Sequence, residues 1–146
     1  EVLPRTNLYD EEKFYFNILK NKDFIFHKRN EDFCSSYNVI DSAMLSITLN
    51  NTLGYENLVR NNKTFFINVN DRNLGCGSFL EFGYPEKFND EGFFWTNKFD
   101  PQKTIKDINY IYNLSDEEWR NETHDIIKKI FIYDKDNFFL KSKLGQ

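Results

Sequence analysis

Histidine and cysteine, the residues best suited to metal binding and nucleophilic chemistry, are few in this sequence and stand apart. There are two histidines, His27 and His124, and two cysteines, Cys34 and Cys76. None of them falls into an HExxH, paired-histidine or CxxC spacing, the patterns that hold a transition metal. A catalytic nucleophile also needs a neighbouring base, and the spacing pairs neither cysteine with a histidine. We therefore predict no metal site and no cofactor, and we predict that the protein is not an enzyme.

Carboxylates are abundant, but their spacing is not that of a catalytic pair. The chain has 23 Asp and Glu residues, several of them adjacent, as in Glu11/Glu12 and Glu117/Glu118. Adjacent residues on a helix point to different faces, so such pairs do not resemble the two carboxylates of a glycosidase. The sequence "GCGS" at 75–78 matches no phosphate-binding pattern, and a turn explains its glycines. Solvent-exposed surfaces are the default explanation for these acids.

The charge of the chain limits its partners. The formal net charge is −4, and Lys and Arg do not gather on one predicted face. Because neutralising phosphates requires a positive surface, nucleic acid is excluded as a direct partner. No window approaches 18 consecutive apolar residues, so no membrane span is predicted. A basic protein partner is compatible with this charge.

The compartment, and with it the thiol state, stays open. The chain begins with Glu1 instead of Met, as processing upstream or a trimmed chain would give. Four Asn-X-Ser/Thr sites could accept glycans in a secreted protein: Asn50, Asn62, Asn113 and Asn121. In that case Cys34 and Cys76 would form one disulfide, whereas in a cytoplasmic protein both would be free thiols.

The middle of the chain has the period-2 pattern of β-strands. Apolar and polar residues alternate in 42–49 and 63–70, and two further apolar runs follow at 77–83 and 92–99. Connections this short are typical of antiparallel neighbours, because parallel strands need a longer crossover. These runs predict an antiparallel β-meander.

Helices are predicted on both sides of this meander. Asp10 could cap an N-terminal helix, and Asp100 followed by Pro101 is a strong helix start. Ser115 and Glu118 form a capping box that opens the next helix. The tail, residues 130–141, could extend that helix or form a hairpin, and its β-propensity favours the hairpin.

Taken together, these elements predict one domain over residues 1–146 with an α+β fold. The fold is an antiparallel β-meander of four to six strands, with an N-terminal helix and a C-terminal helix pair packed on it.

The aromatic residues suggest a binding function. Aromatics make up 18% of the chain, and the segment 76–101 is especially rich in Phe. The alternation leaves Phe94 on the second face of the meander, where either helices cover it or a partner binds it. The leading hypothesis is a small, acidic, non-catalytic binding protein, an inhibitor or immunity-type protein that neutralises one basic protein partner such as a toxin. The predicted contact residues are Tyr84, Asp90, Glu91, Phe94 and Trp95.

A second hypothesis belongs to another class of protein. The chain would be a processed, secreted glycoprotein with one disulfide, which binds a small apolar ligand or a host protein. The four acceptor sites and the two cysteines motivate it. The oligomeric state is left open by both hypotheses.

Overall fold

The computed structural model defines most of the chain. The described residues are 1–4, 9–20, 22–27, 35–49, 51–68, 81–83, 86–98, 100–131 and 138–144. They divide into two units, Glu1–Ala43 and Met44–Gln146. The expectation of one domain over the whole chain stays a prediction.

Within its described residues, the first unit holds two helices and one short backbone pairing. Helix α1 (Tyr9–Leu19) has Asp10, Glu11 and Glu12 in its first turn, where the helix dipole favours negative charge. Helix α2 comprises Ser35–Ser42. Val2 and Phe26 form an isolated parallel bridge, in which the Val2 N–H donates to the Ile25 carbonyl over 2.8 Å.

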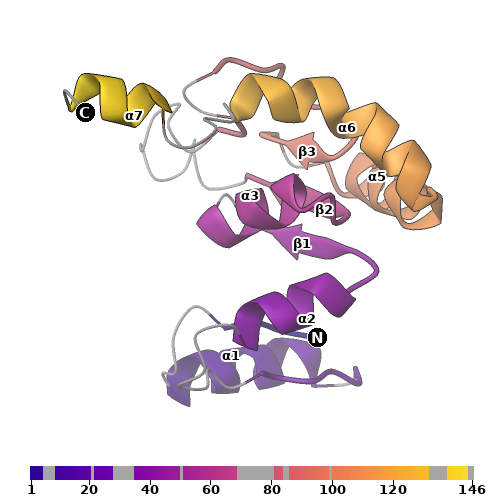
Figure 1. Ribbon diagram of the computed structural model, residues 1–146. Helices are drawn as coiled ribbons and strands as arrows, with labels where there is room; N and C mark the ends of the chain where they lie inside the picture. Colours follow the sequence, from indigo (N-terminus) through magenta and orange to yellow (C-terminus); the bar gives the residue numbers. More distant parts are fainter. Residues whose placement is uncertain are drawn as a thin grey trace. The chain divides into compact units, whose positions relative to one another are not determined.

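The second unit contains a sheet of three parallel strands. They are β1 (Ser46–Thr48), β2 (Thr64–Ile67) and β3 (Trp95–Thr96), hydrogen-bonded in the order β1-β2-β3. Ser46 lies opposite Thr64, and Phe66 lies opposite Trp95. Figure 1 shows the three strands side by side. The predicted antiparallel meander of four to six strands is therefore wrong: the described residues form three strands, all parallel.

Helix α3 (Thr52–Val59) is the physical reason for this correction. It fills the connection between β1 and β2 and returns the chain to the same end of the sheet, so the two strands run parallel. Asn51 caps its first turn, with the side-chain Oδ1 accepting from the Gly54 N–H over 2.8 Å. The antiparallel prediction rests on the shortness of this connection, yet the eight residues "TLGYENLV" suffice for a crossover helix.

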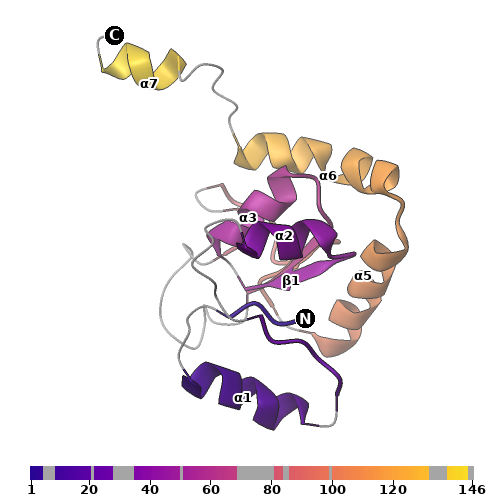
Figure 2. The same cartoon turned by 60° about the horizontal axis from the view of Figure 1, so that its bottom comes forward.

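Two capped helices follow the sheet, as predicted. Helix α5 (Pro101–Asn113) begins after Asp100, whose carboxylate accepts from the N–H groups of Gln102 and Lys103. Helix α6 (Asp116–Ile130) begins with the predicted capping box of Ser115 and Glu118. The Lys63 ammonium donates to the Leu114 carbonyl between the two helices, which neutralises part of the negative end of α5. Figure 2 shows α5 and α6 joined by a short connection.

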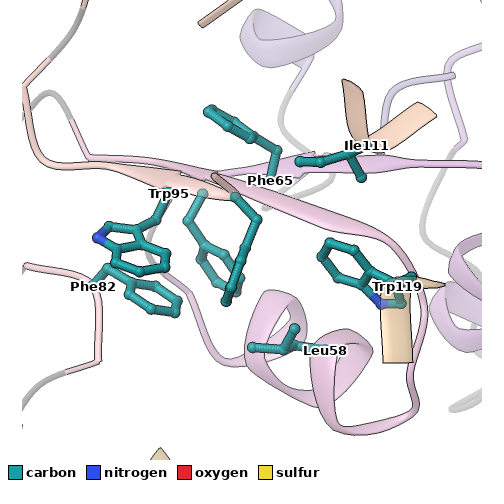
Figure 3. Packing of buried hydrophobic residues seen from close by; sticks show 8 residues of the cluster. Leu58, Phe65, Phe82, Trp95, Ile111 and Trp119 are labelled. Atoms are coloured by element: carbon teal, nitrogen blue, oxygen red, sulfur yellow. The ribbon is translucent and has the colours of Figure 1, made fainter. Parts of the chain in front are cut away.

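The core of the second unit is largely aromatic. Phe66 and Phe82 pack with their ring centroids 4.9 Å apart, and Phe82 stacks on Trp95 at 4.8 Å. Figure 3 shows Phe65 pointing away from Leu58, Phe82 and Trp119, so both faces of the sheet are used. The buried cluster comprises Leu58, Phe65, Phe66, Phe82, Phe94, Trp95, Ile111 and Trp119. Because every one of these residues belongs to 44–146, the second unit contains its own core.

The tail differs from the predicted hairpin. Helix α6 ends at Ile130, and residues Phe138–Lys143 form helix α7. The residues between them, 132–137, are outside the described part of the chain. The second half of the predicted hairpin is therefore helical, which shows that the β-propensity of its Phe residues did not decide the local structure.

Candidate functional site at the carboxyl edge of the parallel sheet

An asparagine follows each of the three parallel strands. Asn51 comes shortly after β1, Asn68 directly after β2 and Asn97 directly after β3. Because the strands are parallel, their carboxyl ends share one edge of the sheet, which is where open α/β sheets bind ligands. This edge is the candidate functional site.

The amides of Asn68 and Asn97 lie next to each other at this edge. The Asn68 Nδ2 is 3.5 Å from the Asn97 Oδ1, and both residues are buried. The Asn97 Oδ1 also accepts from the Phe82 backbone N–H over 3.0 Å. Asn97 therefore ties the turn at 81–83 to the end of β3.

The third amide is used for local structure. The Asn51 Nδ2 donates to the Thr48 Oγ1 over 2.7 Å, while its Oδ1 caps α3. This joins the end of β1 to the start of α3. None of the three asparagines was predicted as a site residue, because their position after a strand has meaning only when the strands are parallel.

An open depression of about 640 Å³ lies beyond the end of β3. Its lining comprises Glu91, Lys98, Asp100, Pro101 and Gln102. Glu91 is placed by a short antiparallel bridge to Thr96, and the last three residues form the start of α5. The depression therefore lies between a strand end and a helix start.

Some polar groups in and beside the depression already form hydrogen bonds and ion pairs with each other. The Lys103 ammonium donates to Asp107 Oδ2 over 2.5 Å, and it is 3.9 Å from Glu91 Oε2. Asp100 Oδ1 accepts from the Gln102 and Lys103 N–H groups at 2.9 and 3.1 Å. Carboxylates and an amide beside ammonium groups can exchange hydrogen bonds with the hydroxyl groups of a polar ligand.

The predicted contact residues divide into rim and core. Glu91 lines the depression, and Asp90 is exposed next to it. Phe94 and Trp95 belong to the buried cluster, where Trp95 also donates from Nε1 to the Asn89 carbonyl over 3.0 Å. Phe94 is therefore covered and is not part of an exposed patch. Tyr84 lies outside the described residues.

Tyr55 connects the core to the turn at 81–83. Its hydroxyl accepts from the Gly83 N–H over 2.8 Å, and its ring stacks on Phe82. Burial raises the pKa of the Tyr55 phenol, and the hydrogen bond from Gly83 offsets part of that rise. Gly83 has a φ of +81°, a conformation that glycine adopts without strain.

The predicted glycan acceptors lie in different environments. Asn62 donates to the buried Asn57 Oδ1 over 2.8 Å, and Asn113 donates to the Asn109 carbonyl over 2.7 Å. Asn121 is exposed on α6. Asn50, like Cys34 and Cys76, is outside the described residues, so the glycosylation and disulfide stay predictions.

Neither histidine belongs to a metal-ligand cluster among the residues that the structure describes. His27 Nε2 is 3.4 Å from Glu1 Oε2, and His124 is exposed on α6. Across the described ranges, no three residues among His, Cys, Asp and Glu are arranged to hold a metal ion. Within the same ranges, no helix is both long and apolar enough to cross a membrane.

Comparison with known proteins gives one family. A model of that family, described as "putative O-antigen biosynthesis protein", matches residues 4–146. Neither a curated protein nor a solved structure matches the chain. The description names O-antigen biosynthesis and not an inhibitor or immunity protein, while the hypothesis of a binding protein that neutralises a basic partner stays a prediction. Because the match covers almost the whole length, the chain belongs to the family described as "putative O-antigen biosynthesis protein".

Proposed function

We propose that the protein serves O-antigen biosynthesis by binding a glycosyl group at the carboxyl edge of its parallel sheet. The depression lined by Glu91, Lys98, Asp100 and Gln102 is the binding site. The O-antigen is a polysaccharide, so a protein of its biosynthesis meets carbohydrate. The observation that carries the proposal is the position of this polar depression, beyond the end of β3, in a chain of this family.

The side chains around the depression support this ligand class. A sugar hydroxyl group both donates and accepts hydrogen bonds. Amide side chains, which also donate and accept, and carboxylates, which only accept, are therefore suitable partners. The Gln102 amide offers a donor and an acceptor, and the carboxylates of Glu91 and Asp100 offer acceptors. Catalysis is not part of the proposal, and the expectation that the protein is not an enzyme stays a prediction. The secreted glycoprotein alternative stays a prediction as well.

The binding site can be tested by NMR. The ¹⁵N-labelled full chain is titrated with a panel of free hexoses, N-acetylhexosamines and nucleoside-diphosphate sugars. We expect at least one sugar to move the backbone amide signals of Glu91, Lys98, Gln102 and Lys103 in a saturable way. Saturable shifts confined to other regions, or no shifts with any sugar, would contradict the proposal.

Matched variants separate the site from the rest of the surface. Gln102→Ala and Lys98→Met remove lining groups, and both should weaken the binding of that sugar. Asn121→Ala and Lys106→Met remove exposed groups of the same chemistry that do not line the depression, and they should leave binding unchanged. Equal losses in both pairs would point to an effect on folding instead of a site.

A further inference from the structure

The charges of the depression disfavour an anionic ligand. Two of its described lining residues, Glu91 and Asp100, carry carboxylates, and one, Lys98, carries an ammonium. Lys103 lies close by, but its ammonium is held by Asp107 and faces Glu91. A negatively charged group of a ligand would be repelled by these carboxylates, and this repulsion weakens binding.

Asp100 also occupies the place where a phosphate would otherwise bind. The start of a helix attracts anions because its first N–H groups are unpaired and its dipole is positive there. In α5 the Asp100 Oδ1 already accepts from the N–H groups of Gln102 and Lys103, at 2.9 and 3.1 Å. The helix therefore presents a carboxylate toward the depression in place of free donors.

Lys98 does not reverse this balance. Lys98 and Asp100 are both exposed, so solvent and salt screen the two charges alike, and Lys98 offsets only one of the two carboxylates of the lining. The backbone of Lys98 is fixed by Thr96, whose hydroxyl accepts from the Lys98 N–H over 3.1 Å and donates to the Lys98 carbonyl over 2.6 Å. Lys98 can thus donate a hydrogen bond to a hydroxyl from a defined position on the rim.

We propose that the depression binds an uncharged part of a saccharide and discriminates against a phosphate-bearing one. The inference rests on the proposed function and adds the charge of the ligand. Hydroxyl groups of a neutral sugar ring donate to the carboxylates of Glu91 and Asp100 and accept from Lys98. Asp100 is the residue that sets this selectivity, because its carboxylate caps α5 and faces the ligand at the same time.

The test compares two ligands that differ by one phosphate. The full chain is titrated with N-acetylglucosamine and with N-acetylglucosamine 1-phosphate, or with another such pair built on the sugar that binds. We expect the neutral sugar to bind roughly two- to fivefold more tightly at low salt, the size of one exposed like-charge contact near a helix start. Raising the salt concentration should narrow the difference, because it screens the repulsion.

Asp100→Ser tests the assigned residue without removing the helix cap, since serine caps helices as well as aspartate does. We expect the variant to bind the neutral sugar more weakly, because it loses an Asp100 acceptor, and to bind the phosphorylated sugar roughly two- to fivefold more tightly than the natural protein does, so that the selectivity falls. Asp116→Ser, at the exposed start of α6, is the matched control and should change neither affinity.

The outcomes distinguish the inference from the function on which it rests. If the phosphorylated sugar binds as tightly as the neutral one, or more tightly, the inference on charge fails and the binding function stands. If Asp100→Ser leaves the selectivity unchanged, the assignment to Asp100 fails. If no sugar of either kind binds, the proposed function fails and the inference falls with it.

Discussion

At the scale of single residues, Glu118 closes the capping box of α6 and makes its stability depend on pH. The Glu118 carboxylate accepts from the Ser115 N–H and hydroxyl, both over 2.7 Å. The Ser115 backbone hydrogen bond first, and its side-chain hydrogen bond second, lower the pKa of Glu118. A carboxyl with a lowered folded-state pKa stabilises the fold above its ordinary pKa and loses that contribution as the pH falls through the folded-state pKa.

We therefore expect Glu118→Gln to flatten the acid side of the stability profile. Chemical denaturation at a series of pH values from neutral to strongly acidic should show a smaller loss of unfolding free energy in the variant than in the natural protein. Glu117→Gln, one position earlier in the same turn, is the control and should keep the original slope. Identical acid profiles for Glu118→Gln and the natural protein would contradict a stabilising capping box.

Tyr55 gives a second prediction at this scale. Tyr55→Phe keeps the ring contacts with Phe66 and Phe82 but leaves the buried Gly83 N–H without its acceptor. An unsatisfied buried donor costs about 1–3 kcal/mol, so the free energy of unfolding at neutral pH should fall by that amount. Urea denaturation measures it, with Tyr112→Phe as the exposed control. A loss no larger than that of the control would show that the Gly83 N–H finds another partner.

The same residue predicts an alkaline effect. Because burial raises the Tyr55 pKa, its neutral form is favoured in the folded state. This contribution is complete below the ordinary tyrosine pKa, near 10, and is lost as the pH rises through the raised folded-state value. The alkaline part of the stability profile should therefore be less steep in Tyr55→Phe than in the natural protein.

At the scale of elements, the approach of α3 to the sheet depends on Gly54. A Cβ at this position would lie 2.5 Å from the Thr48 Cγ2 and 3.1 Å from the Phe66 Cε1. Glycine thus lets the helix pack closely on β1 and β2.

We expect Gly54→Ala to destabilise the protein by about 1–3 kcal/mol, because overpacking outweighs the gain of about 1 kcal/mol in helix propensity. Thr48→Ser removes the methyl group that an added Cβ would meet, so the double variant should recover part of the loss. Thermal or urea unfolding of the four proteins gives the coupling energy. If the two substitutions change the unfolding free energy additively, so that the double variant recovers no stability, the contact between residue 54 and the Thr48 methyl group is not the source of the strain.

The helix starts of the second unit could be predicted from sequence, and the sheet topology could not. Asp100 and the pair Ser115/Glu118 act through hydrogen bonds that span three residues, so their patterns are complete within a short window. The direction of β2 depends on α3. The cap of α3 at Asn51 spans as few residues as the caps of α5 and α6, but it lies between two apolar runs and was not recognised. An amino-terminal cap between two strand patterns is the signal that would have indicated a parallel pair.

The candidate site was predicted only in part, for the same reason. Asp90 and Glu91 were chosen for their charge, and Glu91 does line the depression. Phe94 and Trp95 are predicted contact residues, and the alternation places Phe94 on the second face of the sheet, but the parallel sheet is covered on both faces and both side chains are buried. Asp100 was recognised as a cap, yet its place beside the end of β3 follows only from the fold.

At the scale of the whole molecule, the division after Ala43 predicts that the second unit folds by itself. All residues of the buried cluster, including both tryptophans of the chain, belong to 44–146. Removing residues 1–43 should therefore leave a fragment with a cooperative unfolding transition and with the buried tryptophan emission of the full chain. Tryptophan fluorescence during urea denaturation reports on this core, because the first unit contains no tryptophan.

A shorter fragment serves as the control for this prediction. Residues 52–146 lack β1, which pairs with β2 and contributes Thr48 to the contact with α3. This fragment should lose the cooperative transition and show the red-shifted emission of solvent-exposed tryptophan, because the edge of β2 loses its paired strand and α3 loses its contact with Thr48. If residues 44–146 behave like residues 52–146, the first unit is required for the core to form, and the chain folds as the one domain that its sequence predicted.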